Sequence, residues 1–301
     1  MKVLCYGSIN IDLLFEVDHI ARPGETVSGK SFVKSAGGKG ANQAASLSKA
    51  GLNVFMAGKT GADGNFILEL LESYGVNTDF VVKNSDSSGQ AVIQIDKNGQ
   101  NSIVLYPGGN FEITNKEIEE TIAQFNSGDI IVLQNEINNT GLIIERAKKQ
   151  GMRICFNPSP YNDKIAEAVS GSRSFLNSVN WLFVNEIEGA AVTGLPYKSA
   201  NEAILKSLVK MFPETEIILT TGEDGAFYGF EKTIVKTEIV KTPVADTTGA
   251  GDTFTGYFLA ARERNMTVRQ SMETACRAAA IAVSRKGAME SIPYANEVFV
   301  S

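Results

Sequence analysis

Short hydrophobic runs alternate with helical spacing over the second half of this chain. Apolar runs of about four residues are too short for core helices and favour buried strands. We expect such strands at residues 129–133, 153–156, 181–184 and 216–219. Helices are expected between them, at about 140–150, 162–170, 187–193 and 200–211. This alternation is typical of an α/β fold in which helices cover both faces of a mostly parallel sheet.

The first third of the chain fits the same pattern except in two places. The regular part predicts strands at 3–7 and 53–57 and helices at 41–50 and 65–74. Two β-rich stretches, about 12–34 and 89–107, do not fit a sheet covered by helices. We interpret them as one small sheet that stands off the main domain, although two ordinary edge hairpins would give the same pattern.

The last third predicts a β-hairpin at 226–228 and 234–240 and two helices at about 252–264 and 267–285. A strand is expected to end near Val244, directly before a glycine turn. No repeat or low-complexity tract interrupts the pattern, so we expect residues 1–301 to form a single domain.

Composition and charge exclude several classes of function. The net charge is −6 and the pI about 5.1, so the chain has no basic footprint for nucleic acid. No stretch reaches the roughly 18 apolar residues of a membrane span. The apolar run at the N-terminus is too short for a signal peptide, so we expect a cytoplasmic protein without a membrane partner.

The cysteines and the single histidine limit the chemistry further. Cys5, Cys155 and Cys276 are odd in number and far apart, which argues against a disulfide framework, and we expect buried thiols. A Ser-His-Asp site or a multi-histidine zinc site would depend on His19 alone. If the protein is an enzyme, its general base is therefore expected to be a carboxylate.

The segment Asp246–Phe254 (DTTGAGDTF) is the strongest candidate for chemistry. Its glycines open a helix on which Phe254 and Phe258 recur at helical spacing. Free N–H groups at such a helix start attract a phosphoryl group, and Asp252 beside them could accept a proton from an attacking hydroxyl. The simpler interpretation is that Asp252 only caps the helix. The spacing matches neither a P-loop nor a dinucleotide-binding fingerprint.

Three further segments could bind ligands. Gly37–Ala44 (GGKGANQA) opens another helix, and its Lys39 and Asn42, together with Asn10 and Asp12, could grip a polyol. Asn185 and Glu188 follow a strand and could hold Mg²⁺ through water, or could be a plain capping pattern. The turn 220–226 could approach a nucleotide phosphate or could simply reverse the chain.

These segments, in this order, resemble the PfkB (ribokinase) family of carbohydrate kinases. The likeness runs nearly from end to end. It is carried by residues 7–12, 23–26, 37–44, 58–64, 157–160, 185–188, 221–222, 246–254 and 284–288. The resemblance implies a Rossmann-like three-layer sandwich with a small β-sheet lid, formed here by about 12–34 and 89–107. It also implies a homodimer that associates through the lids.

The resemblance implies a role for each candidate residue. Asp252 would deprotonate the primary hydroxyl of the sugar, and the amides of Gly249, Ala250 and Gly251 would form the anion hole. The sugar would be bound by Asn10, Asp12, Gly38, Lys39, Asn42 and Glu136. ATP and Mg²⁺ would be held by Asn185, Glu188, Thr220, Gly222 and Gly225. A K⁺ ion would lie among Asp246, Thr248, Arg285, Gly287 and Ser291, although Ala288–Ser291 departs from the family pattern.

The leading hypothesis is ATP-dependent phosphorylation of D-ribose to D-ribose 5-phosphate. A kinase for deoxyribose or a ketohexose is the alternative within the family. A non-catalytic sugar- or nucleotide-binding regulator on the same fold is the alternative of a different class, and the intact Gly249–Asp252 argues against it.

Overall fold

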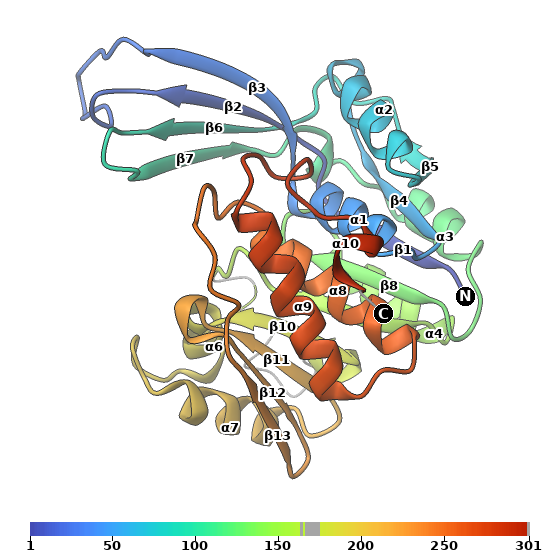
Figure 1. Cartoon of the computed structure of the whole chain (residues 1–301). Coiled ribbons are helices and arrows are strands. Elements are labelled where there is room, and N and C mark those ends of the chain that lie inside the picture. The colour runs from blue at the N-terminus through green and yellow to red at the C-terminus, as the bar shows by residue number, and fades with distance from the viewer. Residues whose placement is uncertain (163–164, 166–174, 300–301) are drawn as a thin grey trace.

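The computed structural model describes residues 1–162, 165 and 175–299, and the fold below refers to these residues (Figure 1). The helix expected at about 162–170 lies, apart from Asn162 and Ile165, outside them. All three cysteines are buried and unpaired, as expected. Among the described residues, no helix combines the length and the apolar character that crossing a membrane requires.

Nine of the described strands form a large sheet in the order β13-β12-β11-β10-β9-β8-β1-β4-β5. Its strands are β1 (Val3–Tyr6), β4 (Val54–Lys59), β5 (Asn77–Val82), β8 (Ile130–Gln134), β9 (Arg153–Asn157), β10 (Trp181–Asn185), β11 (Glu216–Thr220), β12 (Ala226–Phe230) and β13 (Thr233–Thr237). From β11 to β5 in this order, all neighbouring strands are parallel. The hairpin β12–β13 adds antiparallel pairs at the β11 edge. The expected mostly parallel sheet is confirmed.

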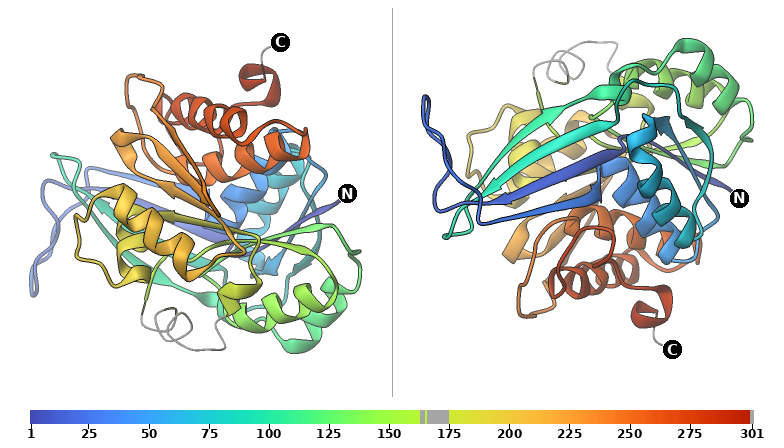
Figure 2. Two further views of the ribbon diagram at one scale, coloured as in Figure 1. Left: turned by 90° about the horizontal axis from the view of Figure 1, so that it is seen from below. Right: turned by 90° about the horizontal axis from the view of Figure 1, so that it is seen from above.

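Helices cover both faces of this sheet and make three layers (Figures 1 and 2). One face carries α1 (Lys39–Lys49), α2 (Asn65–Ser73), α8 (Ala250–Glu263), α9 (Val268–Val283) and the short α10 (Ala295–Val298). The other carries α3 (Asn115–Ile122), α4 (Thr140–Lys149), α6 (Glu186–Thr193) and α7 (Asn201–Met211). Short 3-10 turns lie at η1 (Ala62–Gly64), η2 (Gly108–Phe111), η3 (Phe175–Ser178) and η4 (Gly222–Asp224).

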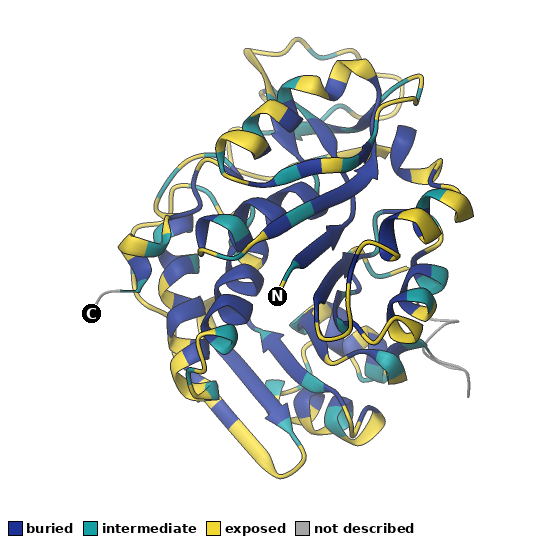
Figure 3. Ribbon diagram, turned by 90° about the vertical axis from the view of Figure 1, so that its right-hand side faces the viewer, coloured by how far each residue is buried: buried dark blue, intermediate teal, exposed yellow. Residues whose placement is uncertain are grey.

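Alternate side chains of β1 point to opposite faces of the large sheet, and each face has its own hydrophobic core. Val3 and Cys5 point into the cluster that contains α1 and α8, whereas Leu4 and Tyr6 point into the cluster that contains α3 and α4. A central strand must therefore be apolar at every position, which is why it reads as a continuous hydrophobic run. Figure 3 shows the same division, with buried strands and with helices exposed on their outer sides.

The two β-rich stretches form one separate small sheet, as expected. Its strands are β2 (Asn10–Glu16), β3 (Ser31–Gly37), β6 (Gly89–Ile95) and β7 (Asn101–Tyr106), in the order β3-β2-β6-β7. Strand β3 begins at Ser31, which pairs with Glu16, the last residue of β2. Since β2 follows β1 after three residues, the small sheet stands at the carboxyl end of β1 (Figure 1).

The prediction of a strand that ends near Val244 is wrong. Residues 238–245 contain no strand, and Val244 is 66% exposed. The neighbouring apolar side chains Ile239 and Val240 are exposed as well, so this run does not add a strand to the sheet. A loop, and not a strand, therefore leads into the glycine segment before α8.

Helices α1 and α8 pack unusually closely, and Gly256 permits it. A Cβ on Gly256 would lie 2.1 Å from Ser46 Oγ and 2.9 Å from Leu47 N. Ser46 Oγ also donates a hydrogen bond to the carbonyl of Thr253 at 3.1 Å. The close approach therefore brings these two helices, some 200 positions apart in the chain, into direct contact.

We predict that Gly256→Ala lowers the free energy of unfolding by about 1–3 kcal/mol, because the added methyl group must push the two helices apart. Urea denaturation monitored by circular dichroism measures this. Gly251→Ala is the matched control in the same helix, since a Cβ there meets no atom of the described structure within 4 Å. Equal stability of the two variants would contradict the close packing.

Candidate active site

Asp252 lies at the contact between α1 and α8 and is 7% exposed. Asn42 Nδ2 donates to its Oδ2 at 3.2 Å, and Gln43 Nε2 donates to its Oδ1 at 2.9 Å. Each oxygen of the carboxylate is thus held by a different amide of α1. Asn42 was expected near Asp252, whereas Gln43 was missed, because nothing in the sequence shows that α1 packs on α8.

The start of α8 has the geometry expected of an anion site. Gly249 precedes the helix in the left-handed conformation at φ 74°, which glycine adopts without strain. Ala250 and Gly251 form the first turn, in which the N–H of Ala250 donates to the carbonyl of Thr247 at 3.3 Å. The first N–H groups of a helix have no partner within the helix itself. A Cβ at Gly251 would meet no described atom within 4 Å, so the space beside this turn is open to a ligand.

Glu136 follows β8 and reaches residues from two other segments. It accepts a hydrogen bond from Ser8 Oγ at 2.5 Å and another from the backbone N–H of Lys39 at 3.2 Å. Gly38, just before α1, has φ 93°, and a Cβ there would lie 2.8 Å from Ser8 O and from Asn10 N. Glycine is therefore required here for the backbone of α1 to approach the end of β1.

The ammonium group of Lys39 lies among carboxylates from three elements. Burial by itself would lower the pKa of Lys39, but the charges of Asp252, Glu136 and Glu188 outweigh it and raise the pKa. Lys39 therefore stays a cation at neutral pH. Its position links the expected sugar-binding residues to the expected nucleotide-binding ones.

Asn10 is held in place by Asn110, a residue that the sequence reading missed. Asn110 Nδ2 donates to Asn10 Oδ1 at 2.7 Å, and Asn110 Oδ1 accepts from the backbone N–H of Ile9 at 3.0 Å. Because Asn10 Oδ1 faces Asn110, its own amide N–H groups are left for other partners. The sequence carries only a weak signal for this role, namely two glycines directly before Asn110. That Asn110 lies next to β2 follows only from the fold.

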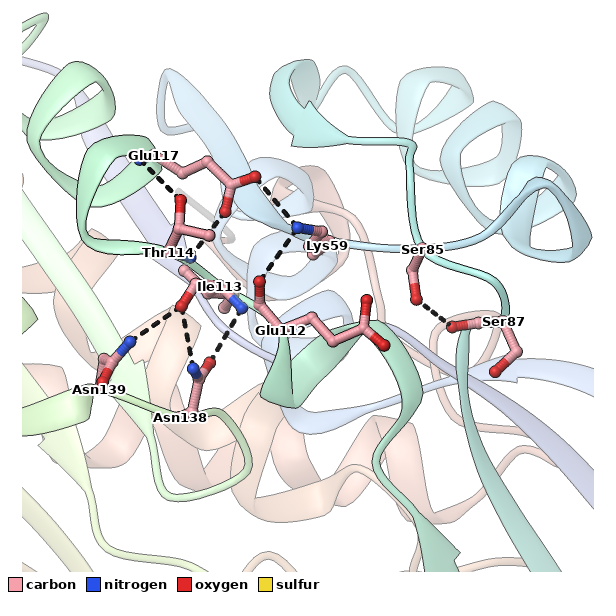
Figure 4. A network of polar contacts seen from close by, with 9 residues as sticks. All are labelled: Lys59, Ser85, Ser87, Glu112, Ile113, Thr114, Glu117, Asn138 and Asn139. Carbon is pink, nitrogen blue, oxygen red and sulfur yellow. Dashed lines mark hydrogen bonds and ion pairs between the residues drawn. The ribbon is translucent and has the colours of Figure 1, made fainter.

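The loop that carries Asn110 is fixed by a polar network around Lys59 (Figure 4). The buried Lys59 Nζ contacts Glu117 Oε1 at 3.1 Å and donates to the carbonyl of Glu112 at 3.0 Å. Asn138 and Asn139 both donate to the carbonyl of Ile113. Glu117 belongs to a capping box at the start of α3, a helix that the sequence reading overlooked although Thr114 and Glu117 have the spacing for it.

Asn185 and Glu188 form a reciprocal capping box at the start of α6. Asn185 accepts from the N–H of Glu188 at 2.8 Å, and Glu188 Oε2 accepts from the N–H of Asn185 at 3.0 Å. The plain capping interpretation therefore holds for their local contacts. Strand register also places Asn185 beside Thr220, at the edge where ligands of parallel sheets bind.

The two glycines after Thr220 have different surroundings. A Cβ at Gly225 would lie 2.1 Å from the carbonyl of Thr237, so the fold itself requires that glycine. Gly222 has φ 52° and would meet no described atom within 4 Å. Of the two, only Gly222 has open space beside it.

The structure brings together part of the expected cation site. The carboxylate of Asp246 accepts from the N–H of Thr248 at 2.9 Å and from the N–H of Gly287 at 3.2 Å. Ser291 Oγ donates to the carbonyl of Ala288 at 2.8 Å. The side chain of Arg285 instead forms an ion pair with Glu297, so only its backbone is left for such a site.

Comparison with known proteins identifies the family. The sequence profile described as "pfkB family carbohydrate kinase" matches residues 1–295. This chain belongs to the pfkB family of carbohydrate kinases. The resemblance inferred from the motifs is thereby confirmed.

Individual relatives agree with this family. The ribokinase of Haemophilus influenzae is 31% identical over 300 residues, covering 97% of this chain and 95% of its own. The deoxyribokinase of Salmonella typhi is also 31% identical, with 97% and 96% covered. The structure of Arabidopsis thaliana ribokinase complexed with ribose and ATP has a TM-score of 0.84 at 29% identity, with 99% and 96% covered. The ribokinase-like fold is therefore confirmed.

We predict that Gly251→Val lowers kinase activity by about tenfold or more, because its side chain occupies the open space beside the first turn of α8 and displaces a bound phosphoryl group. Valine forms helix slightly better than glycine, so stability should change by less than about 1 kcal/mol. Steady-state kinetics and urea denaturation measure the two effects. Full activity would show that no ligand approaches this turn.

A second prediction concerns Asp12 in the ligand-free protein. Burial, followed by the charges of Glu136 and Glu290, raises its pKa from 3.8 to about 7. Between these two pH values the native protein holds a proton that the unfolded chain has released, so this group makes stability fall as pH rises through the window. The free energy of unfolding of Asp12→Asn minus that of the wild type should therefore be larger at pH 8 than at pH 5. Urea denaturation at both pH values measures this, and a pH-independent difference would contradict the shift.

Proposed function

We propose that this protein transfers the γ-phosphoryl group of ATP to the primary hydroxyl of D-ribose and so forms D-ribose 5-phosphate and ADP. The observation that carries the proposal is that the first half of α1 holds both Glu136 and Asp252 through hydrogen bonds, beside the open start of α8. The proposal is also supported by the ribokinase names of relatives that match over the whole chain and by the ribose and ATP of the Arabidopsis complex.

Asp252 would act as the general base. A carboxylate held by two amide donors keeps its orientation, and such a group can accept the proton of a hydroxyl that attacks the γ-phosphate. The amides of Gly249, Ala250 and Gly251 at the start of α8 would face the charge that develops on the phosphoryl group. This role fits the open space at Gly251.

The sugar would lie between the small sheet and the start of α1. Its binding residues are proposed to be Asn10, Asp12, Gly38, Lys39, Asn42 and Glu136. Apart from Gly38, these residues carry side chains that offer the hydrogen-bond acceptors and donors that a polyol requires. The small sheet, attached through β2, would then cover the bound sugar as a lid.

ATP and its metal would lie along the neighbouring strand ends. Asn185, Glu188, Thr220, Gly222 and Gly225 are proposed to face the nucleotide and Mg²⁺. Among the described residues, no three His, Cys, Asp or Glu side chains gather as a metal cage. In kinases Mg²⁺ is usually bound through one or two carboxylates, water and substrate phosphates, and Glu188 is proposed to supply a carboxylate here.

A monovalent cation would bind behind the glycine segment. The oxygen-rich set of Asp246, Thr248, Gly287 and Ser291, with the backbone of Arg285, fits the oxygen ligands that K⁺ takes. Asp246 also joins the loop before α8 to the loop after α9 through its hydrogen bonds. Bound K⁺ would supply positive charge beside the anion site.

A homodimer through the lid is also proposed. The small sheet exposes several large apolar side chains, which is unusual for a free surface. They are Phe32, Val33, Ile103, Val104, Leu105 and Tyr106. The same sheet in a second copy of the chain would cover them.

Asp252→Asn tests the role of the base. We predict that kcat falls by about 10²–10⁴-fold, because the amide cannot accept the proton of the sugar hydroxyl. A coupled ADP-release assay measures the rate, and circular dichroism confirms the fold. Near wild-type turnover in this variant would overturn the assignment of the base.

A panel of sugars tests the substrate. We expect kcat/KM for D-ribose to exceed that for 2-deoxy-D-ribose by at least about tenfold, since a site that pairs with a hydroxyl rejects an analogue that lacks it. D-fructose, a larger ketohexose, should also be a poorer substrate than D-ribose. The assay is run with ATP and Mg²⁺, with and without K⁺. A preference for deoxyribose would support the deoxyribokinase alternative, which the Salmonella relative favours. No turnover with any sugar would support a binding regulator.

A further inference from the structure

The side chain of Gln43 is buried and is used at both ends by other residues. It is 1% exposed. Its Nε2 donates to Asp252 Oδ1 at 2.9 Å, and its Oε1 accepts from Gln134 Nε2 at 2.6 Å. A chain of two amides thus runs from the end of β8 through α1 to the start of α8.

The carboxylate fixes the direction of both amides. An ionised carboxylate only accepts hydrogen bonds, so Gln43 must present its nitrogen to Asp252 and its oxygen to Gln134. Gln134 must then present its own nitrogen, and its Oε1 is left without a hydrogen-bond partner among the described residues. An unpaired buried oxygen costs free energy. In this orientation Gln134 Nε2 holds Gln43 Oε1 at 2.6 Å and also lies 3.8 Å from Cys5 Sγ, so the shorter of its two contacts is the one that orients Gln43.

Asn42 differs from Gln43 in this respect. It also donates to Asp252, but its Oδ1 is buried and has no partner in the described structure. Asn42 therefore has an acceptor that no described group uses, whereas Gln43 has both ends occupied by the protein. The two neighbouring amides of α1 hold the two oxygens of Asp252 in different ways.

We propose that Gln43 is a positioning residue for Asp252: it anchors Oδ1, so that Oδ2 faces the reacting hydroxyl, and Gln134 locks the amide of Gln43 in the required direction. This inference rests on the proposed role of Asp252 as the base. A carboxylate anchored through one oxygen cannot rotate away from its substrate, and small errors in such geometry reduce rates strongly.

The test compares Gln43→Met with the wild type and with Ser46→Ala. Methionine has a similar volume and no amide. Ser46 makes another buried polar contact between α1 and α8, to the carbonyl of Thr253, without touching Asp252. We expect Gln43→Met to lower kcat by about 10- to 100-fold with little change in the KM for the sugar. Ser46→Ala should keep kcat within about twofold, because a contact that serves packing alone does not orient the carboxylate.

A double-mutant cycle separates positioning from general damage. In the Asp252→Asn background, Gln43→Met should cause no further loss, because residues that act as one unit are not additive. Gln134→Met should lower kcat less than Gln43→Met does, since it frees the amide of Gln43 without removing it. If Gln43→Met does not fold, the double variant Gln43→Met/Gln134→Met takes its place, because it removes both amides and leaves neither of them unpaired. This double variant should show the loss of kcat expected for Gln43→Met alone.

Three results would overturn the inference. They are a wild-type kcat in Gln43→Met, an equal loss in Ser46→Ala, and an additive loss in the Asp252→Asn background. In each case an inactive Asp252→Asn would leave the proposed function intact. Full activity of Asp252→Asn would instead overturn the assignment of the base and this inference with it.

Discussion

The candidate site depends on the contact between α1 and α8. Gly256 allows the two helices to approach until Ser46 reaches the carbonyl of Thr253. This approach brings Asn42 and Gln43 within hydrogen-bond distance of Asp252. A buried carboxylate without donors would be costly, so the helix contact supplies the two amide donors that a fixed carboxylate needs at this position.

Charge sets the second constraint. Glu136, Glu188 and Asp252 come from three elements and act together on the single ammonium group of Lys39, and Asp12 lies near Glu136. Such a site suits a neutral polyol, which brings hydroxyl donors and no additional charge. A nucleotide triphosphate needs positive partners there, and Lys39, the amides at the start of α8 and bound cations would supply them.

Much of the fold followed from the sequence because hydrophobic period and glycine position are local signals. The buried strands β8 to β11 and the helices α1, α2 and α8 lie within a few residues of their expected bounds. The exposed run near Val244 gave a false strand, since apolar character alone does not show whether a partner strand is present. Strand β5 was overlooked, and helix α3 was missed although its capping box was visible.

The residues that the sequence identified were those to which the family resemblance assigns a contact with a ligand. Gln43, Gln134, Ser8 and Asn110 were missed because they act on other side chains, and their roles depend on which elements are neighbours. Gly225 is the opposite case. The sequence connected it with a nucleotide, whereas its close contact with the carbonyl of Thr237 is sufficient to require a glycine there. Contacts between segments more than 90 positions apart carry most of the site, and no local pattern predicts them.

The most direct measurement is a crystal structure of the protein with D-ribose and a non-hydrolysable ATP analogue. We predict that the primary hydroxyl lies within about 2.6–3.2 Å of Asp252 Oδ2, the reach of a general base, and that the terminal phosphate lies against the first turn of α8. A sugar whose primary hydroxyl points away from Asp252, or a phosphate bound elsewhere, would contradict this account.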